Sequence, residues 1–343
     1  MLKRAALLEL TAGAAMGIYD RSELGKILDD VERIDPNSIT ALSIRATLAM
    51  REGTLDEAAQ RVEQLAHIDN NNPTAWLTRA SLSHVRDESE QALSEYAKVI
   101  ELDPDNVEAR LARLGLLLDL GRDRDTDSEF EYFDKDVKKK VDPRLAYLAA
   151  IKLSRAGKGK EAAAKLTDAG NTLEVLGHEI VYHNVQLLMV AGIVNFTLGK
   201  DEVARAYLEE YLKLAKGDLI TRKMLATILL KQRDFGRASK LLEQASEQFG
   251  DTPELLALLA RAYTGAGNEA RATAVLQRAV QLQPANSRLA TELALSRALG
   301  ANGNRLKRFI YCIHARQFWR SGRHAAGNSL SQSASVQRSR RRQ

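Results

Sequence analysis

Apolar residues recur at helical spacing through most of the chain, and the pattern repeats with a period of 34 residues. Windows with the same pattern open at Ala5, Ile39, Pro73, Val107, Pro143, Val185, Leu219, Pro253 and Ser287. Each window holds two stretches in which apolar residues lie three and four positions apart, as a buried helical face requires. In the third window these stretches are residues 73–85 and 89–102. The pattern predicts an all-α stack of about eight and a half helical hairpins.

Small residues mark two fixed places in the window. The eighth place holds Ala or Gly in every window except the fourth, which has Leu114, and in the first eight windows the twentieth place holds Ala except at Leu24 and Thr126. Helices approach closely only where side chains are small, so these places predict the crossing point of each hairpin. The fifteenth place often holds glycine, which suits a turn after a helix end. All six prolines fall at window boundaries, where they do not interrupt a helix.

The pattern resembles the tetratricopeptide repeat family over residues 5 to 303. The residues on the family's signature places in the third window are Trp76, Ala80, Ala92, Tyr96, Val99 and Pro104. The resemblance implies a right-handed superhelical α-solenoid over residues 1–304. More finely, the alanine- and leucine-rich windows look like the tetratricopeptide lipoproteins of bacterial PEP-CTERM and exosortase loci. That likeness implies a scaffold for envelope or exopolysaccharide assembly.

The resemblance also implies a binding surface. In this family, places two, five, nine, twelve and thirteen of each first helix face a concave groove. Carried over residue by residue, they give Arg144, Tyr147, Arg155, Gln186, Met189, Phe196, Lys223, Thr227, Lys231, Glu254 and Arg261. This mixture of cations and aromatics suits an extended peptide bearing carboxylates, or an anionic polymer. The expected partner is therefore a protein or peptide.

Two windows are irregular. The second half of the fourth window, residues 122–142, lacks the small residue at place twenty, but Phe130, Phe133 and Val137 could still share a helical face. Its acidic and lysine runs are expected to form a solvated surface. The fifth window carries about eight extra residues near positions 171–184, which are expected to form either a longer second helix or a loop.

Charge separates the last part of the chain from the repeats. The whole chain has a formal net charge of +5, with 50 basic and 45 acidic residues. Residues 305–343 contain ten Lys or Arg and no Asp or Glu, so the remainder carries 40 basic and 45 acidic residues, a net of −5. This tail is consistent with a disordered basic arm, with an amphipathic piece at Arg305–Arg320 that binds a membrane surface or an acidic partner, or with translation out of frame from Asn304.

No constellation of residues predicts catalysis. His178 and His183 are five residues apart and so do not share a helical face as the HExxH zinc motif requires. No phosphate-binding loop, nucleophile motif or paired cysteines occur, and Cys312 is the single cysteine. We therefore expect no enzyme activity, no metal and no cofactor. Binding of nucleic acid or another anionic surface through the basic tail is the alternative function, although nucleic acid is disfavoured because the repeats are acidic.

The sequence gives few indications of location. No apolar run reaches the roughly 18–20 residues of a transmembrane helix, and the N-terminal stretch lies in repeat register rather than resembling a signal peptide. The expectation for the chain as written is cytoplasmic. A truncated N-terminus would instead allow a periplasmic protein attached to the outer membrane. Oligomeric state is left open.

Overall fold

The computed structural model describes residues 21–136, 141–215 and 218–302. Within these ranges the chain forms seventeen α-helices, one short 3-10 helix and no strand. The helices form two compact units, the first ending at Leu187 and the second beginning at Leu188. The predicted all-α fold class is confirmed.

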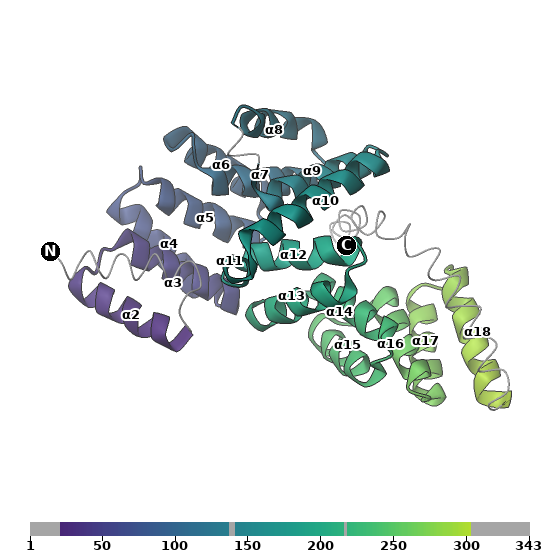
Figure 1. Ribbon diagram of the computed structural model, residues 1–343. Helices are drawn as coiled ribbons and strands as arrows, with labels where there is room; N and C mark the ends of the chain where they lie inside the picture. Colours follow the sequence, from purple (N-terminus) through teal and green to yellow (C-terminus); the bar gives the residue numbers. More distant parts are fainter. Residues whose placement is uncertain (1–20, 137–140, 216–217, 303–343) are drawn as a thin grey trace. The chain divides into compact units, whose positions relative to one another are not determined.

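The first unit consists of successive hairpins in which each helix packs on its neighbours in sequence (Figure 1). Its helices are α2 (Arg21–Ile34), α3 (Ile39–Glu52), α4 (Leu55–Ile68), α5 (Pro73–Val85), α6 (Ser89–Leu102), α7 (Val107–Asp119), η1 (Asp123–Thr126), α8 (Asp127–Asp134), α9 (Pro143–Arg155), α10 (Gly159–Leu176) and α11 (His178–Tyr182). The first helices of neighbouring hairpins also touch, since α3 contacts α5 and α7 contacts α9.

The second unit begins inside α12 (Val185–Thr197) and has the same construction. It continues with α13 (Asp201–Leu214), α14 (Leu219–Lys231), α15 (Phe235–Phe249), α16 (Pro253–Gly265), α17 (Glu269–Leu282) and α18 (Ser287–Asn302). Helices α14 and α16, the first helices of consecutive hairpins, contact each other, and α17 packs on both α16 and α18.

The predicted windows coincide with the helices. From Ile39 to Ser287, each of the eight window openings is the first residue of a helix. The window from Ala5 contributes its second helix as α2, whereas its first half lies outside the described residues. The basic tail, residues 305–343, also lies outside them.

A polar residue just before each window caps its first helix. These residues are Ser38, Asn72, Asn106, Asp142, Asn184, Asp218, Thr252 and Asn286, and each side chain accepts a hydrogen bond from a backbone N–H in the first turn. Such caps satisfy donors that the helix leaves unpaired. Each window opening therefore has its own start signal.

The turn inside each hairpin has left-handed backbone at place fifteen. Five of the seven described turns use glycine there, with φ between 72° and 80°. The other two use Asp87 (φ 65°) and Arg233 (φ 61°). Only glycine adopts this conformation without a steric cost from Cβ. The turns at Asp87 and Arg233 therefore carry a steric cost that glycine would avoid.

Three places of each second helix form the core: twenty, twenty-four and twenty-seven. In α17 these are Ala272, Leu276 and Ala279, all at most 3% exposed. In α2 they are Leu24, Leu28 and Val31, at most 6% exposed. Place eight of the first helix is buried against them, and a Cβ built on Gly192 would lie 2.4 Å from Leu208 at place twenty-four. The structure thus extends the predicted crossing point to a strip of three buried positions.

The irregular windows keep the hairpin plan. After α7 comes η1 and then the eight-residue α8, in which Phe133 is fully buried and Phe130 partly buried. Val137 lies outside the described residues. In the next window the longer second helix is the correct alternative, because α10 runs for 18 residues before α11.

Candidate functional site

In the first unit, the predicted surface residue Arg144 is held by neighbouring repeats. Its guanidinium donates to both Glu108 carboxylate oxygens on α7 at 2.7 and 2.8 Å, to Asp142 at 2.7 Å and to the Gln186 side-chain oxygen at 2.6 Å. Burial alone would lower the pKa of Arg144, but hydrogen bonds to Asp142 and Glu108 raise it above its usual value. Arg144 therefore links three consecutive hairpins.

Arg155, the second predicted cation of this unit, is also committed to an internal contact. Its Nη1 donates to the Leu118 backbone oxygen and lies 3.2 Å from the Asp123 carboxylate, and its side chain is 12% exposed. Tyr147, on the same helix, is partly buried and has interactions of its own. Arg155 thus joins α9 to the end of α7 and the turn that follows it.

In the second unit, Phe196 and Lys231 lie together. The Lys231 Nζ is 5.4 Å from the centre of the Phe196 ring and donates to the two Asp201 carboxylate oxygens at 2.8 and 2.9 Å. The Lys231 side chain is 18% exposed. This cation is neutralised by Asp201, so it offers a partner little free charge.

Arg261 is tied to the last described helix. Its Nη2 donates to Glu292 on α18 at 2.7 Å, and Glu292 also lies 3.4 Å from Arg288. One carboxylate thus balances two cations that project from α16 and α18. Like Arg144, Arg261 joins successive first helices.

The remaining predicted residues of the second unit are more open. Lys223 on α14 is partly exposed, and Glu254 on α16 is exposed. Neither side chain forms an ion pair within the described ranges. Thr227 follows Lys223 by one helical turn and donates to its backbone oxygen at 2.8 Å. Ile220, three residues before Lys223, is 50% exposed. This places a cation and an apolar side chain next to each other on α14.

The other predicted residues are less conspicuous. Met189, on α12, is partly buried, and Gln186 is exposed beside Arg144 in the first unit. Because Gln186 belongs to the first unit and Met189 to the second, the structure shows two separate sets of surface residues.

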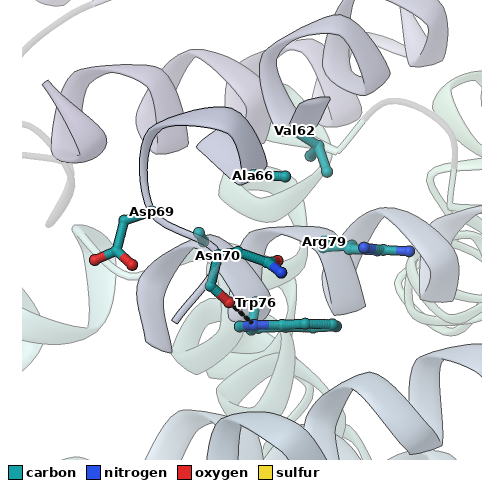
Figure 2. Close-up of a pocket in the computed structure, with 7 residues that line it drawn as sticks. Val62, Ala66, Asp69, Asn70, Trp76 and Arg79 are labelled. Carbon is teal, nitrogen blue, oxygen red and sulfur yellow. Dashed lines mark hydrogen bonds between the residues drawn. The ribbon is translucent and has the colours of Figure 1, made fainter. Parts of the chain in front are cut away.

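A small pocket lies on the first unit between α4 and α5 (Figure 2). The Trp76 Nε1 donates to the Asn70 backbone oxygen at 2.7 Å, and the Arg79 guanidinium lies 5.1 Å from the ring centre. The pocket volume is about 10 Å³, against roughly 300–1,000 Å³ for ordinary small-molecule sites. It has room for little more than a water molecule.

Two buried carboxylates are features that the sequence analysis did not predict. Glu95 accepts from Arg79 at 2.8 Å, Ser83 at 2.6 Å and Gln91 at 3.0 Å. Glu129 accepts from Arg110 at 2.8 Å and from Arg113. Both carboxylates stand at place twenty-three and pair with an arginine at place seven, so a comparison of these two places between windows could have revealed them. Glu129 also corrects the expectation that the acidic run is wholly solvated.

The histidines of the rejected zinc motif have other contacts. The His178 ring stacks on Tyr182 at 3.7 Å between centres, and the His183 Nδ1 lies 2.7 Å from the Glu179 backbone oxygen. Both residues lie in or next to the short α11. Among the described helices, none is long and apolar enough to cross a membrane.

Comparison with known proteins identifies the repeats. A tetratricopeptide repeat profile matches residues 199–262 and 229–295. Residues 199–295 thus match the tetratricopeptide repeat pattern. The predicted family is thereby supported, and tetratricopeptide folds generally mediate protein–protein interactions.

Solved structures match the chain at low sequence identity, and one of them has a TM-score above 0.5. The hetero-tetramer Cut9–Hcn1 of the APC/C matches with a TM-score of 0.56 and 14% identity, over 79% of this chain and 51% of that one. This chain thus spans about half the length of that match. YrrB, a tetratricopeptide protein with an unusual peptide-binding site, has a TM-score of 0.33 and 18% identity over 67% and 96% of the two chains. Pseudomonas aeruginosa pilF has a TM-score of 0.38 and 16% sequence identity, over 76% of this chain and 96% of that one. No curated protein sequence matches.

Proposed function

We propose that the chain is a non-catalytic scaffold that binds a segment of a partner protein on the first-helix surface of its second unit. The observation that carries this proposal is Lys223, a cation without an ion pair in the described ranges, beside the half-exposed Ile220. By contrast, Lys231 and Arg261 are already paired. An acidic group next to an apolar side chain in the partner would complement Lys223 and Ile220.

The test is selection of peptides from a phage-displayed random 12-residue library against the full chain. We expect enriched peptides to carry Asp or Glu close to an apolar residue. Lys223→Glu should weaken their binding about tenfold or more, because it replaces attraction by repulsion. The matched control is Lys240→Glu on the second helix α15, whose side chain is also exposed.

The two outcomes are distinct in isothermal titration of a selected peptide. If Lys223→Glu and Lys240→Glu bind it equally well, the proposed surface is wrong. If Lys240→Glu alone weakens binding, the partner surface lies on the second helices instead.

A finer proposal is that the partner belongs to a bacterial envelope or exopolysaccharide assembly. It is supported by the resemblance to PEP-CTERM-associated tetratricopeptide lipoproteins. The prediction of a cytoplasmic location stands beside it as the competing proposal. Fractionation of cells that express the native gene, with antibody detection of the chain in the cytoplasmic, periplasmic and membrane fractions, would decide between them.

The alternative function is binding of nucleic acid or another anionic surface through residues 305–343, supported by their ten basic residues. A phosphate-driven contact loses affinity steeply as salt rises. Deletion of residues 305–343 should abolish such binding and leave the peptide-binding surface of the second unit intact.

A further inference from the structure

The charged residues on the first helices of the second unit differ according to their place along the helix. Late in α14, Lys231 at place thirteen pairs with Asp201 at 2.8 Å. Late in α16, Arg261 at place nine pairs with Glu292 at 2.7 Å. The later parts of these two helices therefore have their charges balanced by acidic residues of the chain itself.

The early parts of the same helices carry charges that are not balanced in this way. Lys223 is at place five of α14 and partly exposed, and Glu254 is at place two of α16 and exposed. Within the described part of the chain neither forms an ion pair. Arg288, at place two of α18, lies 3.4 Å from Glu292 on its own helix. One cation and one anion are thus left open on two consecutive first helices.

The two open charges are close enough for one partner segment to contact both. Helices α14 and α16 touch each other and run in the same direction, because α15 returns the chain between them (Figure 1). The axes of packed helices lie about 8–10 Å apart, and three places along a helix add about 4.5 Å. The Cα atoms of Lys223 and Glu254 are therefore about 10 Å apart, a distance that about three residues of an extended chain span.

The neighbouring side chains suit such a segment. Ile220, about one turn before Lys223, is 50% exposed and would contact an apolar side chain of the partner. Ala257, about one turn after Glu254, is partly exposed and small. It therefore leaves the approach to Glu254 open.

We propose that the partner segment is extended and carries an acidic and a basic residue about three positions apart, the acidic one on Lys223 and the basic one on Glu254. This inference rests on the proposed function and adds a second charge to the partner. Two contacts of opposite sign fix the register of the segment and disfavour segments that carry acidic residues alone. Both contacts are open to solvent, so they weaken as salt rises.

Charge reversal in the full chain tests the proposal. A 12-residue peptide selected on the wild type is titrated into the wild type, Glu254→Lys and the matched control Glu247→Lys. Glu247 is an exposed residue of the second helix α15. Glu254→Lys should weaken binding about fivefold or more, because it replaces attraction by repulsion. Glu247→Lys should leave binding within about twofold.

A rescue experiment separates lost contact from lost folding. Glu254 lies in the first turn of α16, where the helix dipole favours an acidic residue, so its reversal also affects the helix. A second peptide, with its basic residue changed to Glu, should bind Glu254→Lys better than it binds the wild type. Only a folded variant can show this exchange of preference.

The outcomes distinguish this proposal from the one on which it rests. If Lys223→Glu weakens binding and Glu254→Lys does not, the second unit binds acidic segments but the paired-charge proposal is wrong. If neither variant differs from its control, both proposals are wrong. Selected peptides that lack a basic residue at this spacing, or a second peptide that still prefers the wild type, would also overturn the paired-charge proposal.

Discussion

At the scale of single residues, the turn at place fifteen has the same left-handed backbone conformation in every described hairpin turn, but its side chain differs between hairpins. Arg233 adopts φ 61° where its counterpart in the next repeat is Gly267, with φ 79°. A side chain in the left-handed region costs roughly 1–2 kcal/mol, partly offset because a non-glycine residue restricts the unfolded chain.

We therefore expect Arg233→Gly to stabilise the protein by about 0.5–1 kcal/mol. The reverse change, Gly267→Ala, should destabilise it by about 1 kcal/mol. Urea unfolding followed by circular dichroism measures both. A loss of stability in Arg233→Gly would mean that the arginine side chain contributes more than its backbone strain costs.

A partly buried imidazole makes the first unit sensitive to acid. Burial lowers the pKa of His84 below its usual value, with a smaller opposing contribution from Asp87. Its Nδ1 lies 3.3 Å from the Tyr96 hydroxyl. Between the folded and unfolded pKa values the unfolded chain binds more protons, so this group's contribution to stability falls as pH drops below about 6.5.

The urea midpoint of the wild type should accordingly fall more between pH 7.5 and pH 5.5 than that of His84→Gln. His67→Gln is the control, because the His67 side chain is 80% exposed and should keep the full pH dependence. Identical pH dependence in all three proteins would rule out His84 as the sensitive group.

At the scale of the helix pair, a hairpin depends on how closely its two helices approach. A Cβ on Gly192 would lie 2.4 and 2.9 Å from side-chain atoms of Leu208, which is fully buried. A Cβ on Gly115 would meet Leu148 at an ordinary 3.8 Å. The two glycines are both inside first helices but differ in the space around them.

Gly192→Ala should therefore destabilise the protein by about 1–3 kcal/mol, because the clash exceeds the gain in helix propensity. Gly115→Ala should be neutral or stabilising by up to about 1 kcal/mol. Thermal unfolding of both variants is the measurement. Stabilisation by Gly192→Ala would show that Leu208 can move aside.

At the same scale, the sequence predicts the elements well and the contacts between repeats poorly. The boundaries of α5 and α6 follow from apolar spacing, because that spacing is local. The Arg144–Glu108 pair depends on two side chains 36 residues apart, whose pairing the period does not specify. The sequence predicts the positions of the surface residues but not their ion pairs. Lys231 and Arg261 are neutralised by Asp201 and Glu292, which lie outside the predicted set of positions.

At the scale of the whole molecule, the same two places are filled differently along the chain. Places seven and twenty-three are Arg79 and Glu95 in the first unit but Leu225 and Leu241 in the second. Only the carboxylate of this pair is buried, because the Arg79 side chain is 43% exposed and that of Glu95 is 5% exposed. Burying a charge is costly, and an apolar pair of similar volume is often as stable. The same helical hairpin thus accepts either a charged pair or an apolar pair at places seven and twenty-three.

Arg79→Leu alone should destabilise the protein by roughly 2–3 kcal/mol, because it leaves the Glu95 carboxylate buried with only neutral donors. Adding Glu95→Leu should recover most of that loss by reproducing the apolar pair of the second unit. The double-mutant cycle is measured by urea unfolding. Additive losses would show that the two positions do not act as a pair.

The contacts that join repeats also have a kinetic consequence. Arg144 reaches Glu108 and Gln186, at separations of 36 and 42 residues, and the Lys231–Asp201 and Arg261–Glu292 bonds span 30 and 31. Such contacts require only that one hairpin and the next have been synthesised. A chain of this kind can nucleate at any pair of neighbouring repeats and grow outward, and short separations favour rapid folding. During translation each new hairpin would therefore find its docking surface already in place.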